Sequence, residues 1–261
     1  MAYETLDVEK EKNTATIYLN RPEVHNALNE PLMNELIHCF NDLITDEDIR
    51  IIILTGNGKS FCAGADLHWM KRMVHYSKEE NIKDSNLLLQ LYDTIYQCPK
   101  PVIARINGHA FGGGLGLFAV CDLAIAVPEC KFAFSEVKLG IIPSVISTFI
   151  ARRITGLAHM RRLFITGERF SPIKAEQIGL IDQISPQDEI DDAIQKYVSI
   201  LKSSGPKAIS EIKKLVDSYE TLSIEKYKEY TVKKIAELRI SKEGQEGINS
   251  FLEKRKTKWS E

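Results

Sequence analysis

Two glycine-rich segments and one glutamate supply the groups in this chain that are best suited to catalysis. The segments are Cys62–Asp66 (CAGAD) and Gly108–Gly114 (GHAFGGG), and each stands at the end of an expected strand. Glycine and alanine let a ligand approach the backbone closely. The free N–H groups of a helix's first turn attract an oxygen that carries negative charge. These residues therefore favour a site in which main-chain amides hold an anionic oxygen.

Glu136, in the segment FSEV, is the candidate acid or base. A positioned glutamate can take a proton from water and return a proton to carbon. The apolar segment FAF before it, with Leu139 and Ile141 after it, should exclude water from the carboxyl and raise its pKa. The alternative is an ordinary glutamate at a strand end, in water or in an ion pair.

Several other classes of site do not fit the sequence. GHAFGGGLG does not match the dinucleotide fingerprint G-x-G-x-x-G, and the chain has no P-loop motif. A net charge of −2 gives no footprint for nucleic-acid binding. The five cysteines are scattered without a CxxC pair, which argues against a zinc site and a disulfide framework. We therefore expect no metal, nucleic acid or membrane partner, and a cytoplasmic location with reduced thiols.

Alternating strand and helix patterns fill the chain up to residue 185. The alternation in residues 3–20 predicts an opening pair of antiparallel strands. Asn29 before Pro31 predicts the start of a helix. The β-branched run Ile49–Thr55 predicts a strand of a parallel sheet, buried on both faces. Strand–helix units of this kind predict an α/β fold.

From residue 186 onward the chain contains four charged amphipathic helical segments and no strand pattern. A chain of 261 residues is expected to form one main domain with a smaller appendage. We therefore expect residues 1–185 to form the core with the site. Residues 186–261 are expected to form a helical region that acts as a lid and in oligomer contacts.

The segments FCAGADL, INGHAFGGGLGL and FSEVKLGIIP, in this order and spacing, resemble the crotonase superfamily of enoyl-CoA hydratases and isomerases. The resemblance covers essentially the whole chain. It implies a crotonase (ClpP-like) spiral of ββα units with a C-terminal helical region. It also implies a homotrimer or a homohexamer, a dimer of trimers. No cofactor is implied, because coenzyme A arrives as part of the acyl-CoA substrate.

The resemblance carries specific roles to residues of this chain. Ala65 and Gly113 match the two amide donors of the family's oxyanion hole, and Glu136 matches its second catalytic glutamate. Each such donor contributes roughly 2.7–4 kcal/mol to transition-state stabilisation. The residues at positions that hold coenzyme A, largely through backbone contacts, are Val24, Ala27, Ala63, Asp66 and Leu67.

Gly116 departs from the pattern of the hydratases, which carry their first glutamate directly after GGG-x. One interpretation is a hydratase that uses Glu136 alone and has room at Gly116 for a branched acyl chain. A second is a helix glycine kept for close packing, at ~1 kcal/mol against alanine. A third is an isomerase, in which one carboxylate shuttles a proton between two carbons.

The segments GGGLGLFAVCDLAIA and CAGADLHWMKRM look most like bacterial methylglutaconyl-CoA and carboxygeranoyl-CoA hydratases. This resemblance implies hydration of a branched 2-enoyl-CoA of the 3-methylglutaconyl type, as in leucine degradation. Lys71 or Arg72 would bind its second carboxylate, although basic residues on a helix usually face solvent. Ser144 and Ser147 are candidate contacts to a water or a polar acyl group. A non-catalytic acyl-CoA- or RNA-binding relative is the alternative of another class.

Overall fold

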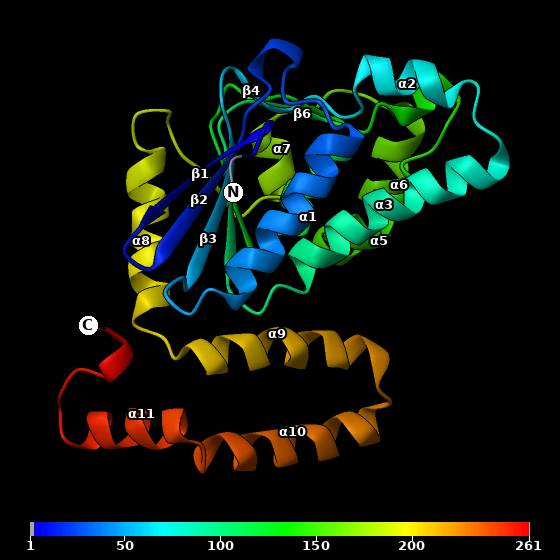
Figure 1. The fold of residues 1–261 in the computed structure, drawn as a ribbon. Coiled ribbons are helices and arrows are strands. Elements are labelled where there is room, and N and C mark those ends of the chain that lie inside the picture. Colours follow the sequence, from blue (N-terminus) through cyan, green and yellow to red (C-terminus); the bar gives the residue numbers. More distant parts are fainter. Residues whose placement is uncertain (1–2, 261) are drawn as a thin grey trace. The chain divides into compact units, whose positions relative to one another are not determined.

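The computed structural model describes residues 3–260, and the chain divides into two compact units (Figure 1). The first unit comprises residues 1–98 and 102–194, and the second comprises residues 99–101 and 195–261. The division falls inside helix α8 (Ile190–Lys202). The change in sequence pattern at residue 186 lies four residues before the start of α8.

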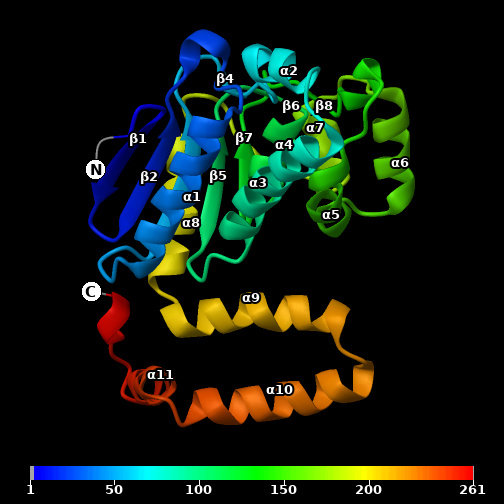
Figure 2. The same cartoon turned by 45° about the vertical axis from the view of Figure 1, so that its right-hand side comes forward.

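The larger sheet of the first unit has six strands in the order β1-β2-β3-β5-β7-β9 (Figure 2). They are β1 (Leu6–Glu11), β2 (Thr14–Leu19), β3 (Ile51–Gly56), β5 (Val102–Ile106), β7 (Leu123–Ala126) and β9 (Gln183–Ile184). The pair β1–β2 is antiparallel and the other pairings are parallel. All six residues of β3 are buried, as predicted for a strand covered on both faces. The predicted antiparallel opening is also confirmed.

Helices cover the larger sheet. Helix α1 (Glu30–Thr45) and helix α3 (Lys78–Tyr96) pack against each other across one of its faces (Figure 2). Asn29 begins α1 as predicted, because its side chain accepts a hydrogen bond from the amide of Leu32. The other short elements of this unit are η1 (Pro22–Val24), α2 (Leu67–Met73), α4 (Gly113–Ala119), η2 (Glu136–Leu139), α5 (Ser144–Arg153), α6 (Leu157–Thr166) and α7 (Pro172–Gln177).

A second sheet of three short parallel strands carries the glycine-rich segments. It is formed by β4 (Ser60–Cys62), β6 (His109–Phe111) and β8 (Phe132–Ala133), in the order β4-β6-β8. Both pairings are parallel. The carboxyl ends of the three strands therefore lie at one edge of this sheet, and the loops that leave them are neighbours.

Asn26 ties the loop after β2 to the turn before β4. Its side chain is fully buried, accepts a hydrogen bond from the amide of Arg21 (2.9 Å), and donates to the carbonyls of Asn57 and Ser60 (2.9 Å each). Its φ is +55°, in the left-handed region that asparagine tolerates better than most residues. Three hydrogen bonds thus fix the loop that runs beside the glycine-rich edge.

We predict that Asn26→Ala destabilises the protein by roughly 2–4 kcal/mol, because buried donors and acceptors lose their partners. The free energy of unfolding in urea measures this change. Asn34→Ala is the matched control, because Asn34 is exposed and bonds only the carbonyl of Glu30 on its own helix. A loss of less than about 1 kcal/mol in Asn26→Ala would contradict the tether.

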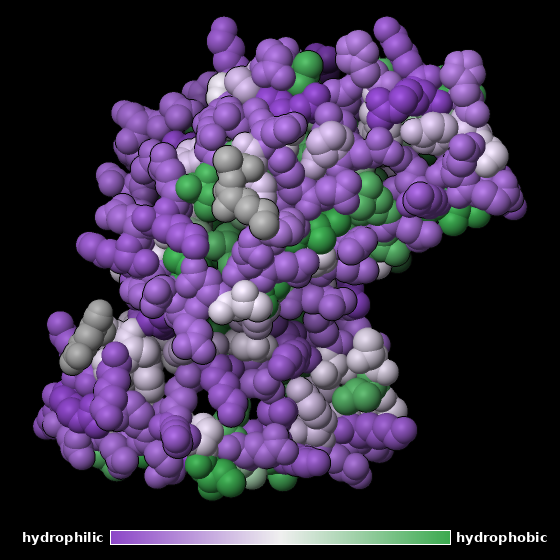
Figure 3. Space-filling view, in the orientation of Figure 1, coloured by the Kyte–Doolittle hydropathy of each residue, from purple (hydrophilic) through white to green (hydrophobic). Residues whose placement is uncertain are grey.

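The second unit is helical, as the sequence predicts. After the last part of α8 it contains α9 (Pro206–Thr221), α10 (Ile224–Arg239), α11 (Lys242–Leu252) and η3 (Lys258–Ser260). Figure 3 shows separate apolar patches among hydrophilic side chains on these helices. The most exposed large apolar residues of this unit are Val216, Tyr219, Val232, Ile240, Phe251 and Leu252. Each of these side chains is more than half exposed.

Two further features concern membranes and cysteines. Within residues 3–260, no helix combines the length and the apolar character that a bilayer span requires. All five cysteines are buried, and no disulfide joins them.

Candidate active site

The three strand ends of the smaller sheet bring the predicted catalytic residues into one neighbourhood. Ala65 is the third residue after β4, Gly113 the second after β6, and Glu136 the third after β8. These strands are adjacent and parallel, so each residue leaves the same edge of the sheet. Residues far apart in the sequence thus occupy neighbouring loops.

The first two loops touch through their backbones. Gly64 has a φ of +89°, and a Cβ atom built on it would lie 2.7 Å from the carbonyl oxygen of Phe111 and 3.7 Å from the Gly113 nitrogen. Only glycine permits both the backbone angle and the approach. The absence of a side chain at this position is what lets the two amide-bearing corners meet.

The amides of Ala65 and Gly113 have no hydrogen-bond acceptor within the described part of the chain. On either side of Ala65, the carbonyl of Gly64 accepts from the Leu28 amide (2.6 Å), and the Asp66 amide donates to the Leu28 carbonyl (2.8 Å). Gly113 is the first residue of α4, where an N–H has no partner inside the helix. Ala65 is exposed and Gly113 is partly exposed. Both amides are therefore available to an acceptor from outside the chain.

Glu136 is half-buried, and its carboxyl lies beside the turn at Gly112 and Gly113, the glycine corner. A Cβ atom on Gly112 would lie 3.2 Å from the Glu136 Oε1 atom, and Oε2 is buried without a hydrogen-bond partner among residues 3–260. Burial raises the pKa of Glu136, and a hydrogen bond from its own backbone offsets part of that rise. No neighbouring acidic residue of the described chain contributes to the shift. A raised pKa suits a group that must both accept and return a proton.

The expected apolar enclosure of Glu136 is only partly correct. Phe134 is fully buried, but Leu139 and Ile141 are 58% and 55% exposed. They lie at the end of η2 and in the loop after it, which run along the surface. The glycine corner, rather than these two side chains, lies against the carboxyl.

Gly116 has no open space beside it. A Cβ atom there would lie 2.6 Å from Cγ2 of Ile146 and 2.7 Å from Cζ of Tyr92. The interpretation of Gly116 as room for a larger acyl chain is therefore wrong, because two side chains already fill that volume. Close packing explains the glycine, and a glutamate would require Tyr92 to move.

Asp66 is occupied by structural contacts. Its carboxylate is buried, pairs with Arg21 (Nη2 to Oδ2, 2.8 Å), and accepts the amides of His68 (2.7 Å) and Trp69 (3.2 Å) at the start of α2. Burial raises the pKa of Asp66, but the Arg21 guanidinium and the two amides outweigh it and lower the pKa below its usual range. Its backbone is engaged as well, because the amide donates to the Leu28 carbonyl (2.8 Å) and the carbonyl accepts the Met70 amide (2.8 Å).

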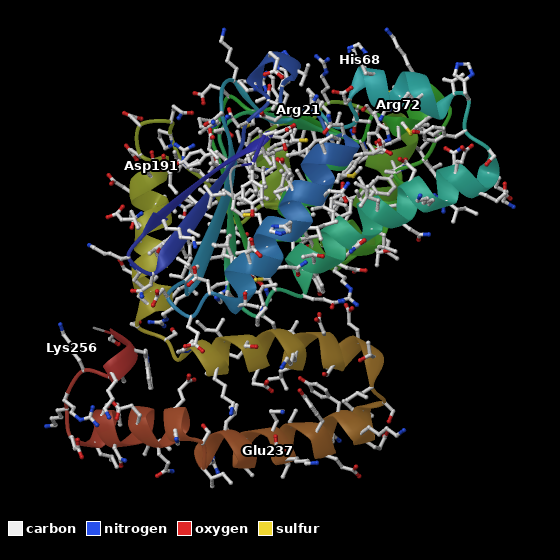
Figure 4. All side chains as sticks on the ribbon, viewed as in Figure 1. Arg21, His68, Arg72, Asp191, Glu237 and Lys256 are labelled. Carbon is white, nitrogen blue, oxygen red and sulfur yellow. The ribbon has the colours of Figure 1, made fainter. Side chains whose placement is uncertain are left out.

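Arg21 was not among the residues predicted from the sequence. Its guanidinium also donates to the Ala27 carbonyl, so it joins the loop after β2 to the start of α2 (Figure 4). The segment RPEVHNAL that contains Arg21 carries turn residues, but nothing in that pattern points to a partner at position 66.

Four other predicted binding residues lie in the loops near Ala65 or at the start of α2. The loops that hold Val24, Ala27 and Ala63 are joined, because the Ala63 amide donates to the His25 carbonyl (3.0 Å) and the Ala27 amide to that of Val24 (3.1 Å). Leu67 follows on α2 and is 73% exposed.

Ser144 stands apart from these loops, at the start of α5, and is exposed. Its carbonyl accepts the hydroxyl of Ser147 (2.5 Å). Within the described residues it forms no hydrogen bond with the other predicted site residues.

Lys71 and Arg72 lie on α2, which Figure 4 marks at His68 and Arg72. Arg72 pairs with Glu30 (Nη2 to Oε2, 3.0 Å), and both side chains are about half exposed. Such a surface pair contributes little to stability, because solvent screens the two charges. Lys71 is exposed and has no ion pair among residues 3–260.

A separate open cavity of about 730 Å³ is lined mainly by residues of α1 and α3. The residues that line it include Glu30, Asn34, Tyr76, Glu80, Lys83 and Leu87. None of the predicted site residues lines it.

We predict that Glu136→Gln makes the protein more stable at pH 7. Because the pKa of Glu136 is higher in the folded state than in the unfolded state, folding stability falls as pH rises from the ordinary glutamate pKa through the raised one. The glutamine side chain in the variant carries no charge, so the variant does not lose stability in this way. Near pH 3, more than one unit below the ordinary glutamate pKa of about 4.3, the wild-type carboxyl is protonated in both states and the difference should disappear.

Urea unfolding of both proteins at the two pH values measures this effect. Glu129→Gln, at an exposed position of the same unit, should show no comparable gain at pH 7. Equal stability of wild type and Glu136→Gln at pH 7 would mean that the carboxyl is not held in a desolvated setting.

Comparisons with known proteins extend these observations. The profile of the family described as enoyl-CoA hydratase/isomerase matches residues 9–261. The crystal structure of an enoyl-CoA hydratase from Shewanella pealeana is 37% identical, with a TM-score of 0.94 over 98% of this chain and 96% of that chain.

Curated relatives agree with this match. The crotonyl-CoA hydratase of Syntrophomonas wolfei is 32% identical over 257 residues, which is 98% of this chain and 98% of the relative. A protein of Mycosarcoma maydis named as an enoyl-CoA isomerase/hydratase is 32% identical over 249 residues, 92% of this chain and 90% of the relative.

Proposed function

Since the chain belongs to the enoyl-CoA hydratase/isomerase family of enzymes, we propose that it is a lyase that adds water in syn fashion to a 2-enoyl-CoA thioester. The observation that carries this proposal is the Glu136 carboxyl, which has one buried oxygen without a partner among residues 3–260. It lies against the glycine corner, whose Gly113 amide is free. The relatives named as hydratases support the same reaction.

The amides of Ala65 and Gly113 would bind the thioester oxygen. As water attacks the β-carbon, electrons move onto this oxygen and an enolate forms. Backbone donors that are oriented before the reaction stabilise this charge, at roughly 2.7–4 kcal/mol for each donor. Charge held in this way needs no metal and no further cofactor, and coenzyme A enters as part of the substrate.

Glu136 would act first as base and then as acid. Its carboxylate takes a proton from the attacking water, whose oxygen bonds to the β-carbon, and the carboxyl then returns that proton to the α-carbon. The atoms of one water molecule are thus added across the double bond, and the glutamate is restored. The raised pKa supports this double role, because the carboxyl holds a proton more readily than an exposed glutamate does.

We predict that Glu136→Gln lowers kcat by about 10²–10⁴-fold, the range that a positioned acid–base group contributes. Loss of the conjugated thioester absorbance during incubation with a 2-enoyl-CoA measures the rate. Glu129→Gln, at an exposed position, should retain wild-type turnover. A non-catalytic acyl-CoA-binding protein would show the same signal with and without the Glu136 carboxyl, and that result would refute the proposed role.

An isomerase is the second candidate, and the single carboxylate favours it. Gly116 carries no acid, and no other acidic residue of the described chain contributes to the pKa shift of Glu136. One carboxyl suffices to move a proton between two carbons of a 3-enoyl-CoA. Turnover of 3-enoyl-CoA, without absorbance loss from straight or branched 2-enoyl-CoA, would replace the hydratase assignment with this one.

We also propose a branched substrate of the 3-methylglutaconyl type. The sequence resemblance in α2 and α4 supports this proposal, and Lys71 is a cation without an ion pair among residues 3–260. We predict a higher kcat/KM for 3-methylglutaconyl-CoA than for crotonyl-CoA. Lys71→Met should reduce this preference by about tenfold, because a charge-assisted hydrogen bond is lost. Lys78→Met, at another exposed lysine, is the control.

Assembly as a homotrimer or homohexamer is proposed on similar grounds. The exposed apolar side chains of α9–α11 support it, because exposed apolar surface is typical of contacts between proteins. Light scattering of the intact protein measures the mass, and a particle of 29.6 kDa would contradict assembly.

A further inference from the structure

Tyr92 of α3 is a buried phenol with a single specific partner. Its side chain is fully buried, and its hydroxyl donates a hydrogen bond of 2.7 Å to the carbonyl of Gly113. A buried hydroxyl requires such a partner, since an unpaired one would be costly. The partner belongs to the same residue whose amide is free. Tyr92 therefore acts directly on the glycine corner.

The glycine corner is tethered on both sides of the Gly113 amide. Before it, the Gly112 amide donates to the Ala133 carbonyl of β8 (3.0 Å). After it, the Gly113 carbonyl accepts the hydroxyl of Tyr92. Gly112 has φ +49° and ψ −123°, a backbone conformation that residues with a side chain rarely adopt. The corner is therefore built from glycines, whose backbone is flexible. The two tethers remove that freedom and fix the direction of the N–H group between them.

The ring of Tyr92 is itself held in place, and this accounts for Gly116. It packs edge-on against the ring of Phe149, with centroids 5.9 Å apart. A Cβ atom on Gly116 would lie 2.7 Å from its Cζ atom and 2.8 Å from its hydroxyl oxygen. Tyr92 and a side chain at position 116 thus compete for one volume. In this chain the ring of Tyr92 fills that volume.

We propose that Tyr92 is a positioning residue that sets the direction of the Gly113 amide through the Gly113 carbonyl, in the volume that a side chain at position 116 would fill. The inference rests on the proposed binding of the thioester oxygen by that amide. Burial raises the pKa of Tyr92 well above its ordinary value, which keeps the hydroxyl protonated as a donor.

Tyr92→Phe removes the hydroxyl and keeps the ring. We predict that kcat falls about tenfold while KM changes by less than about twofold, because a misdirected oxyanion donor weakens the transition state more than the ground state. Tyr96→Phe is the matched control. Tyr96 lies one turn further along α3 and also packs on Phe149 (5.5 Å), but its hydroxyl accepts from Arg152 (2.6 Å). Its removal should leave both constants within about twofold of wild type.

A binding measurement separates positioning from a general loss of structure. The dissociation constants of a saturated acyl-CoA thioester and of the S-alkyl-CoA thioether of equal length are compared. Only the thioester offers a carbonyl oxygen to the amides. The wild type should prefer the thioester, Tyr92→Phe should reduce this preference about tenfold, and Tyr96→Phe should retain it.

Each outcome bears on the proposal. A full thioester preference and full kcat in Tyr92→Phe would overturn the positioning role and leave the proposed function intact. No preference in the wild type would overturn the amide site and the positioning role together. Gly116→Ala provides an independent variant, because its Cβ atom forces the ring to shift. It should reproduce the loss, and the double variant should lose little more than either single one.

Discussion

Parallel pairing of three short strands is the constraint on which the candidate site depends. β4, β6 and β8 together contain few residues, yet their register aligns three chain segments that are far apart in the sequence. Each strand ends two or three residues before a residue of the site. A slip of one residue in this register would turn side chains to the opposite face and displace the amides. The geometry of the site is thus inherited from backbone hydrogen bonds.

Close backbone contact is the second requirement, and glycine makes it possible. Gly64 meets the carbonyl of Phe111, and a Cβ atom on Gly114 would overlap the carbonyl of Cys62. Glycine makes these backbone segments flexible. Side-chain hydrogen bonds of Asn26, Arg21 and Tyr92 restrict that flexibility. The site also contains a desolvated carboxyl, Glu136, whose burial opposes folding at neutral pH. The role proposed for Glu136 and the stability of the fold therefore make opposite demands on this one residue.

Much of the fold was predictable from local pattern. The antiparallel opening, the buried strand β3, the helix start at Asn29 and the four C-terminal helices follow from period, capping and composition. The crotonase fold expected from the motifs is confirmed by solved structures of high similarity. The motif residues were identifiable because three segments at successive strand ends, in a fixed order, form a far more specific pattern than any one glycine-rich corner.

The sequence by itself determined the class of fold, the family and the residues able to supply amides and a carboxyl. It did so because backbone preferences and short motifs are local properties. Only the tertiary structure showed that Tyr92 fills the volume beside Gly116, that Arg21 holds Asp66, and that Leu139 and Ile141 are exposed and do not enclose Glu136. These are contacts between distant segments, and no local pattern records which side chain will occupy the space that a glycine leaves.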